Sequence, residues 1–300
     1  MKLSVVVSTL NGREPLLACL DALRERTPAR TEVVVVNGPS SDGTTGAVRD
    51  RDDVDVLVEI SERNPNVSRN AGIANATGDV IAFLRDEYAI RAAWYEAIET
   101  AAEAGADVVT GPVSGEPAHE SDPKTSRSVG GRTVASFDGD NVALSRAALE
   151  ALDGFDEYLV VGGARDCAHR LGALEFDVTW SAEMAVRRDV GTDGGRATPD
   201  WGDRYRSLAY RLAKNYGPRP TAVARTAGSA LRDGLGSTRA VVTGEATPTG
   251  WFGNGTAVLT NALGGFRDGL RARYRDRTER RNPNGVSARR DRAVRVYDRR

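Results

Sequence analysis

Short runs of β-branched residues alternate with segments of helical spacing over the first 113 residues. Residues 3–8 and 32–37 are such runs, and between them Leu16, Leu20 and Leu23 recur at the spacing of one helix face. Strands that alternate with helices predict an α/β fold with a mainly parallel sheet and helices on both of its faces. Ligands of such sheets bind outside the carboxyl ends of the strands, so binding residues are expected just after each strand.

The same alternation continues along the chain. The further expected elements are a strand at 54–60, a Gly- and Asn-rich helix near 67–77, a buried strand at 79–84, a helix near 92–104, a strand at 107–113, a helical block at about 145–173 and a strand at 176–180. Residues 114–135 are rich in Ser, Gly, Pro and charge, as expected of an excursion from the fold. Gly-, Pro- and Thr-rich stretches at 190–201 and 243–256 are predicted to be linkers.

Charge divides the chain more clearly than hydropathy does. Residues 1–200 contain 20 Lys and Arg against 34 Asp and Glu, whereas residues 201–300 contain 21 against 8. The overall net charge of −1 therefore conceals an acidic body joined to a basic C-terminal region. We expect a Rossmann-like catalytic domain at 1–190 and a helical basic C-terminal region at 191–300.

Two apolar helix faces are expected in the C-terminal region. One consists of Tyr205, Leu208, Leu212 and Tyr216, and the other of Leu259, Leu263, Phe266, Leu270 and Tyr274. Arginines surround both faces, and such helices either dock on a membrane surface or pack on the rest of the protein. We predict peripheral membrane contact and keep packing as the alternative, above all for the first helix. No run of apolar residues reaches the length that a membrane span requires.

The first residues and the cysteines bear on location. The apolar run at the start is too short for a signal peptide. Cys19 and Cys167 are far apart in sequence, which fits a reducing compartment better than a disulfide framework. We therefore expect a cytoplasmic protein, on the inner face of the cell membrane if the C-terminal region docks there. A nucleic-acid partner is not expected, because aromatic residues are sparse in the basic region and no nucleic-acid motif is present.

Three segments after predicted strands carry polar residues suited to binding. Residues 8–12 read Ser-Thr-Leu-Asn-Gly and residues 37–43 read Asn-Gly-Pro-Ser-Ser-Asp-Gly, and either loop alone is equally typical of an ordinary turn. In the third segment, a helix that carries Arg69 leads into a buried strand that ends in Arg85, Asp86 and Glu87. Adjacent carboxylates at a strand end suit a divalent cation or ribose hydroxyls, although a solvated turn is the commoner setting for such a pair alone.

In their order and spacing these segments resemble the inverting family 2 glycosyltransferases, which have a GT-A-type fold. The resemblance covers roughly residues 3–190 and extends to residues 140–146 and 154–157, which are similar to the family's acceptor-side half. It implies that a nucleotide-sugar donor binds to Thr9, Asn11, Asn37, Asp42, Arg69, Asn70 and Asp86. It also implies that Asp86 and Glu87 hold a divalent cation, Mn or Mg.

Two departures from the family's pattern concern positive charge. Arg85 stands where the family's acidic motif usually begins with Asp, and Arg188 stands where a histidine often closes the metal site. Either these arginines take over work of the cation by giving positive charge to the leaving diphosphate, or they only pair with nearby acids such as Asp86, Glu87 or Asp189. On the first alternative, Arg85 and Arg188 are catalytic residues and the reaction is metal-independent.

A third departure concerns the general base. Where the family has an acidic pair, this chain has Gly163 and Ala164, which leaves Asp166 as the candidate catalytic base, with Asp86 or Glu87 as a fallback. The alternative for Asp166 is a charge near a helix N-terminus that favours the helix dipole.

The resemblance implies transfer of a hexose from a nucleoside diphosphate sugar to the hydroxyl of a glycan or lipid-linked acceptor, with inversion. Similar archaeal enzymes assemble surface-layer and protein-linked glycans. The alternative is a glycosyltransferase fold that binds nucleotide sugar or partners without turnover, because a fold does not certify an activity.

Overall fold

A computed structural model of the chain describes residues 1–114, 127–129, 132–188, 201–219 and 248–300. The chain divides into two units. The first comprises Met1–Tyr158, Gly163–Arg196 and Asn284–Arg300, and the second comprises Leu159–Gly162 and Ala197–Pro283.

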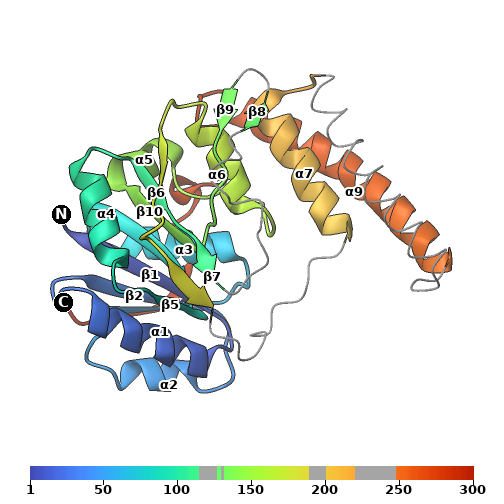
Figure 1. Cartoon of the computed structure of the whole chain (residues 1–300). Helices are drawn as coiled ribbons and strands as arrows, with labels where there is room; N and C mark the ends of the chain where they lie inside the picture. Colours follow the sequence, from blue (N-terminus) through green and yellow to red (C-terminus); the bar gives the residue numbers. More distant parts are fainter. Residues whose placement is uncertain (115–126, 130–131, 189–200, 220–247) are drawn as a thin grey trace. The chain divides into compact units, whose positions relative to one another are not determined.

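The first unit is built on an eight-stranded sheet with the strand order β11-β6-β10-β4-β1-β2-β3-β13 (Figure 1). Its strands are β1 (Leu3–Thr9), β2 (Glu32–Asn37), β3 (Val56–Ile60), β4 (Val80–Arg85), β6 (Val108–Thr110), β10 (Asn141–Ser145), β11 (Val178–Trp180) and β13 (Ala293–Asp298). Strands β4, β1, β2 and β3 are parallel, as are β6 and β11, whereas β10 and β13 run antiparallel to their neighbours. The predicted α/β fold with a mainly parallel sheet is confirmed.

Helices and two small sheets complete this unit. The helices are α1 (Arg13–Arg26), α2 (Thr44–Arg49), α3 (Pro65–Asn75), α4 (Trp94–Glu103), α5 (Arg146–Leu152), α6 (Gly163–Leu171) and the 3-10 helix η2 (Val286–Ala288). The small sheets contain β5 (Tyr88–Ile90), β12 (Val186–Arg188) and β7 (Val113–Ser114), and β8 (Arg127–Val129) with β9 (Arg132–Val134). The predicted helical block at 145–173 is two helices, because Asp153 and Gly154 adopt left-handed backbone conformations that end α5. In the predicted excursion at 114–135, Ser114 ends β7 and a later part forms the β8–β9 pair, whereas residues 115–126 and 130–131 lie outside the described residues.

Alternating side chains of β1 face opposite layers of helices. Val5 and Val7 belong to the core that also contains Leu16 and Leu20 of α1. On the opposite side, Gly72 of α3 lies so close to Val6 that a Cβ at position 72 would overlap the Val6 side chain. The strand period of two thus buries both faces of the sheet, as a parallel sheet requires.

The local start of α3 explains how this helix meets the strand ends. Asn64 has extended backbone geometry, and its side chain accepts a hydrogen bond from the Asn66 N–H at 2.9 Å. Pro65 occupies the first helical position, where its missing N–H costs no hydrogen bond. These features start α3 at Pro65, shortly after β3 ends at Ile60.

The second unit contains α7 (Trp201–Tyr216) and α9 (Pro248–Arg275), which pack on each other. A Cβ at Gly265 would overlap the backbone of Arg206, and one at Gly269 would overlap the backbone of Tyr210. Small residues spaced by four thus let the two helices approach closely. Among the described helices, none is long and apolar enough to cross a membrane.

The structure divides the chain at other points than the expected boundary near residue 190. Residues 284–300 belong to the first unit, and β13 pairs antiparallel with β3 at the edge of the main sheet. The segment at 293–298 contains both apolar and charged residues. Although it is rich in charge, its backbone groups pair with those of β3 at the edge of the sheet. Of the expected linkers, the one at 190–201 lies almost entirely outside the described residues, and the one at 243–256 overlaps the first turns of α9.

Candidate functional site

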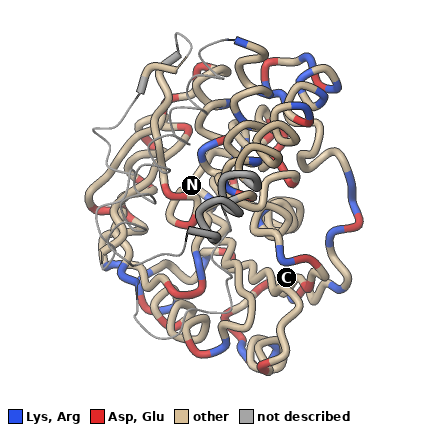
Figure 2. The backbone as a smooth tube through the Cα atoms, turned by 90° about the vertical axis from the view of Figure 1, so that its right-hand side faces the viewer, with Lys and Arg blue, Asp and Glu red and all other residues tan. Residues whose placement is uncertain are grey.

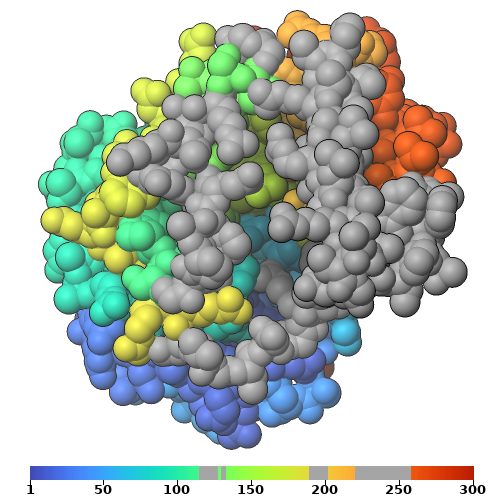
Figure 3. Space-filling model, turned by 45° about the vertical axis from the view of Figure 1, so that its right-hand side comes forward, coloured from blue at the N-terminus to red at the C-terminus, as the bar shows by residue number. Residues whose placement is uncertain are grey.

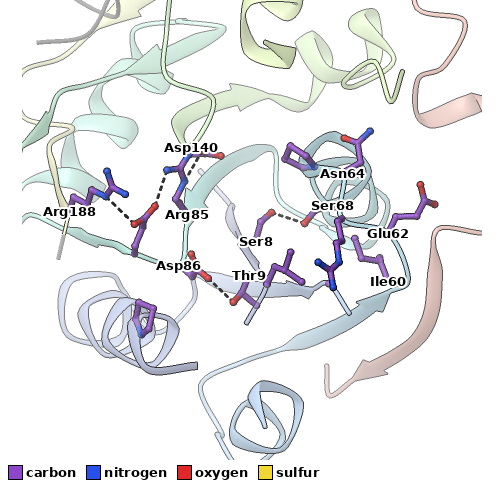
Figure 4. A pocket seen from close by; sticks show the side chains of 16 residues that line it. Ser8, Thr9, Ile60, Glu62, Asn64, Ser68, Arg85, Asp86, Asp140 and Arg188 are labelled. Carbon is purple, nitrogen blue, oxygen red and sulfur yellow. Dashed lines mark hydrogen bonds and ion pairs between the residues drawn. The ribbon is translucent and has the colours of Figure 1, made fainter. Parts of the chain in front are cut away.

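A pocket opens at the carboxyl ends of the parallel strands (Figure 4). Thr9 ends β1, Gly38 follows β2, Ile60 ends β3 and Arg85 ends β4. Because these ends meet at one edge of the sheet, the pocket lies where ligands of such sheets bind. It is lined by Ser8, Thr9, Leu10, Pro15, Gly38, Ile60, Glu62, Arg63, Asn64, Pro65, Ser68, Arg85, Asp86, Glu87, Asp140 and Arg188.

A network of charged side chains spans one side of the pocket. Both carboxylate oxygens of Asp140 are engaged: one accepts from Arg69 at 2.5 Å, and the other accepts from Arg85 Nε at 3.0 Å and Nη2 at 2.5 Å. Arg85 also donates to Glu87 at 2.8 Å, and Arg188 donates to the second oxygen of Glu87 at 3.0 Å. We call these five residues the charge network; Figure 4 shows its Arg85, Asp140 and Arg188 together on one side of the pocket.

The charge of Asp140 favours the charged form of Arg85. Burial alone would lower the pKa of Arg85, but the charge of Asp140, with smaller contributions from Tyr88 and Glu87, raises it above its ordinary value. Asp138, whose carboxylate accepts a hydrogen bond from the Asp140 N–H at 2.8 Å, has its pKa raised by burial and then by the charge of Asp140. Charge-assisted hydrogen bonds of this kind are short and hold their partners in fixed geometry.

Asp86 is held from the opposite direction. Its carboxylate accepts a hydrogen bond from the Thr9 hydroxyl at 2.7 Å. Gly12 approaches so closely that a Cβ there would overlap the Asp86 carboxylate. Thus β1 and the loop after it determine where this carboxylate faces the pocket, and the structure brings the predicted Thr9 and Asp86 together.

The predicted Asn11, Asn37 and Asp42 lie outside the lining. Asn11 and Asp42 join the two loops to each other, and Asn37 holds the second loop from within. Asn11 has a left-handed backbone conformation, φ 52°, and its side chain accepts from the Ser41 N–H at 2.8 Å. Asn37 is buried, and its amide donates to Thr45 and accepts from Ser40. These contacts shape the loops around the pocket.

Asp42 connects the starts of α1 and α2. It accepts hydrogen bonds from the N–H groups of Arg13 at 3.0 Å and Thr44 at 3.1 Å. Partial burial alone would raise the pKa of Asp42, but the hydrogen bonds from Thr44 and Arg13 outweigh it and lower the pKa. Its carboxylate thus stabilises two helix N-termini.

Arg69 and Asn70 are buried and also lie outside the lining. Arg69 donates to Asn66 at 2.8 Å and to Asp140. The Asn70 amide donates to the Phe155 carbonyl and accepts from the Phe155 N–H, both at 2.8 Å. Both residues therefore support the pocket from behind, and the neighbouring Ser68, which donates to Ser8 at 2.7 Å, is the residue of this segment that faces it.

Asp166, the predicted base, lies outside the lining and is fully buried. It accepts a hydrogen bond from Arg170 at 2.8 Å, and both side chains have no exposed surface. Gly163, at the position of the missing acidic pair, lies so close to Asn66 that a Cβ would overlap its amide. The structure therefore gives Asp166 a buried ion-pair role, because the helix turn from 166 to 170 directs its carboxylate to Arg170.

The predicted cation ligands Asp86 and Glu87 have different surroundings. Both oxygens of Glu87 accept hydrogen bonds from arginines, so Glu87 is the counter-ion of Arg85 and Arg188 and does not present an open ligand. Within the described part of the chain, no three His, Cys, Asp or Glu side chains come close enough to form a metal-binding group. The pair of carboxylate ligands that the sequence predicts does not fit this arrangement.

The charged and amide side chains of the lining that were not predicted as site residues are Glu62, Arg63, Asn64 and Asp140. Asn64 followed by Pro65 is a helix-start signal after a predicted strand, and it could have identified this side of the pocket. Asp140 lies in a segment that resembles the family, but its contacts with Arg69 and Arg85 join residues 71 and 55 positions apart, which no local pattern reveals.

Solved structures of glycosyltransferases share this fold. The mannosyltransferase PcManGT from Pyrobaculum calidifontis, in complex with GDP-Man and Mn2+, is 20% identical with a TM-score of 0.58, over 89% of this chain and 87% of that one. S. aureus TarS 1-349, in complex with UDP-GlcNAc, is 18% identical with a TM-score of 0.57, over 92% of both chains. At such low identity these likenesses show the GT-A-type fold.

The model of the family described as Glycosyl transferase family 2 matches residues 4–159, and the chain therefore belongs to this family. It is 28% identical over 198 residues to the glycosyltransferase AglE of Haloferax volcanii. That match covers 60% of this chain and spans 64% of the length of AglE. The chain thus belongs to a family of glycosyltransferases and shares the fold of solved glycosyltransferase structures.

The buried Asp166–Arg170 pair leads to a prediction about stability. Asp166→Asn should lower the free energy of unfolding by about 3–5 kcal/mol, because Arg170 would keep a buried charge without its counter-ion. Urea unfolding measures this, with the exposed Asp177→Asn as the matched control that should change little. A variant that unfolds like the wild type but has lost glycosyl transfer would instead make Asp166 the base.

Proposed function

We propose that the protein transfers a hexose from a nucleoside diphosphate sugar to the hydroxyl of a glycan or lipid-linked acceptor, with inversion, in cell-surface or protein-linked glycan assembly. The observation that carries the proposal is the pocket at the strand ends, which combines Thr9 and Asp86 with a row of arginines. The GDP-Man and UDP-GlcNAc complexes of structures with this fold support a nucleotide-sugar donor, and the similarity to AglE supports the class of pathway.

The chemistry requires an accepting base and positive charge near the leaving diphosphate. Arg85 and Arg188 are suited to the second task, because Glu87 and Asp140 hold their guanidinium groups at the pocket in fixed geometry. Arg63 also lines the pocket and adds a third positive charge. Two unit charges 4 Å apart interact by about 4 kcal/mol at an effective dielectric of 20, so partial use of this interaction changes rates by orders of magnitude.

A divalent cation held by Asp86 together with the donor's phosphates is the alternative source of positive charge. Such an ion would polarise the leaving group. The Mn2+ complex of PcManGT supports this alternative, whereas the engagement of both Glu87 oxygens by arginines supports the metal-independent one.

A second candidate function is binding of a nucleotide sugar or of partners without turnover. The observation in its favour is that Gly163 and Ala164 occupy the two positions where the family has the acidic pair that supplies its base. Gly163 has no room for a side chain, and the Asp166 carboxylate is buried against Arg170. Among the residues that the structure describes, the carboxylates that line the pocket are Glu62, Asp86, Glu87 and Asp140, and of these Asp86 is our candidate for the base.

We also propose that the protein works in the cytoplasm and contacts the inner face of the membrane through α9. Leu259 and Leu263 are 67% and 72% exposed, and Arg267 and Arg271 continue the same row at four-residue spacing. In the space-filling view the orange-red residues of α9 reach the surface (Figure 3). Tyr205, Leu212 and Tyr216 of α7 are buried, so the proposal does not extend to the first predicted face.

The donor proposal is tested by titrating the full-length protein with GDP- and UDP-hexoses and following both binding and sugar release. Asp86→Asn should weaken donor binding by about tenfold or more, the equivalent of about 1.4 kcal/mol, while the melting temperature hardly changes because asparagine can still accept from Thr9. The exposed Asp52→Asn is the matched control. Binding without sugar release or transfer would favour the second candidate function, and absence of binding to either nucleotide would contradict both.

The membrane proposal is tested by sedimentation with vesicles. The protein should sediment with vesicles that contain anionic phosphatidylglycerol, and the double variant Leu259→Ser/Leu263→Ser should remain in the supernatant. Part of the attachment should persist at 1 M salt, where the Debye length is about 3 Å, because the apolar residues contribute independently of charge. Val294→Ser removes an equally exposed apolar side chain from β13 and should have no effect. Equal sedimentation of all variants would contradict the proposal.

A further inference from the structure

The last seventeen residues of the chain belong to the first unit and contact the rest of it near both of their ends. At residues 284–287, Asp153 accepts from the N–H and the hydroxyl of Ser287 at 2.9 and 2.6 Å, and Asp156 accepts from the Asn284 amide at 3.0 Å. At residues 293–298, β13 extends the sheet beside β3. Figure 2 shows basic and acidic residues together around the C-terminus, where Arg300 pairs with Glu32 at 2.7 Å. We call residues 284–300 the C-terminal segment.

Glu157 connects this segment to the body of the unit. One of its carboxylate oxygens accepts from Asn70 of α3 at 2.8 Å and from Arg292, and the other accepts from Arg289 Nε at 2.8 Å. The Glu157 side chain is only 9% exposed, as is appropriate for a carboxylate that has three charged or amide partners. The C-terminal segment therefore supplies two of the groups that allow this carboxylate to be buried.

Arg289 also contacts a residue that lines the pocket. Arg289 Nη1 lies 2.6 Å from Glu62 Oε1, so its guanidinium bridges Glu157 and Glu62. Residues 60–65 form a wall of the pocket opposite the charge network, and the labelled Ile60, Glu62 and Asn64 lie together on that side in Figure 4. Asn64 is also bound to Glu157, because its side-chain amide donates a hydrogen bond to the Glu157 backbone carbonyl at 2.7 Å. We call residues 60–65 the 60–65 wall.

We propose that Arg289 is a positioning residue for the donor: by bridging Glu157 and Glu62 it holds the 60–65 wall in place, which makes the C-terminal segment part of the donor-binding site. This inference rests on the proposed function. Glu62 lies two residues after the end of β3, and its side chain is 41% exposed, so without Arg289 it would be anchored only through the backbone of the strand and of Asn64. Arg63, which also lines the pocket, lies between these two residues in the sequence.

The experiment compares Arg289→Ala with Arg290→Ala, which removes the same charge from an exposed neighbouring position. Binding of GDP and of UDP is measured by calorimetry on the full-length protein, and backbone hydrogen exchange is followed at residues 61–68. Arg289→Ala should weaken binding of the preferred nucleotide by about tenfold and speed exchange in the 60–65 wall, whereas Arg290→Ala should match the wild type. With a donor that turns over, Arg289→Ala should raise KM and leave kcat nearly unchanged, since the residue does not touch the reacting atoms.

A double-mutant cycle separates positioning from a general loss of stability. If Arg289 acts through Glu62, then Arg289→Ala should add little to the loss of nucleotide binding already caused by Glu62→Ala. Fully additive losses, or unchanged nucleotide binding in Arg289→Ala, would overturn the inference. The exchange measurement needs no ligand: faster exchange in the 60–65 wall of Arg289→Ala, in a protein whose wild type binds neither nucleotide, would leave Arg289 as a structural brace and place the failure in the proposed function.

Discussion

The arrangement of the pocket depends on the ion pairs that the carboxylate of Asp140 forms with two arginines. It lies just before β10, which pairs with β4, and it receives Arg69 from α3 and Arg85 from the end of β4. Three elements that are distant in the sequence, α3, β4 and the start of β10, thus meet at one buried carboxylate. Removing Asp140 would leave the buried guanidinium of Arg69 without its counter-ion, which is far more costly than losing a surface ion pair.

This buried charge also determines what the pocket offers to a ligand. Because Asp140 and Glu87 hold Arg85, and Glu87 holds Arg188, two guanidinium groups stand beside Asp86 at the strand ends. The acidic motif of the family is consequently converted into a mixed site in which acids orient arginines. A donor diphosphate would meet preorganised positive charge, and preorganisation reduces the reorganisation that accompanies bond breaking.

The sequence predicted the fold well because strand and helix periods are local signals. The alternation around Leu16 and in residues 3–8 and 32–37 identified the parallel core. Site residues were predicted less well. Asn37 and Asp42 follow the right strands, but short polar side chains in loops bond to neighbouring backbone as readily as to ligands, and only coordinates distinguish the two. Arg289 and β13 escaped prediction because the charge of the C-terminal region suggested a separate segment, whereas antiparallel pairing with β3 depends on backbone groups.

The central claim, that arginines held by Asp140 and Glu87 supply the positive charge for the donor, is tested most directly by measuring donor turnover with and without a chelator in the wild type, Arg85→Ala and Arg188→Ala. The account predicts that the wild type keeps its turnover with the chelator present. It also predicts that each substitution slows the reaction by roughly tenfold to a thousandfold, a few kcal/mol in transition-state stabilisation. Complete loss of turnover with chelator, restored by manganese or magnesium and accompanied by normal rates in both variants, would contradict it.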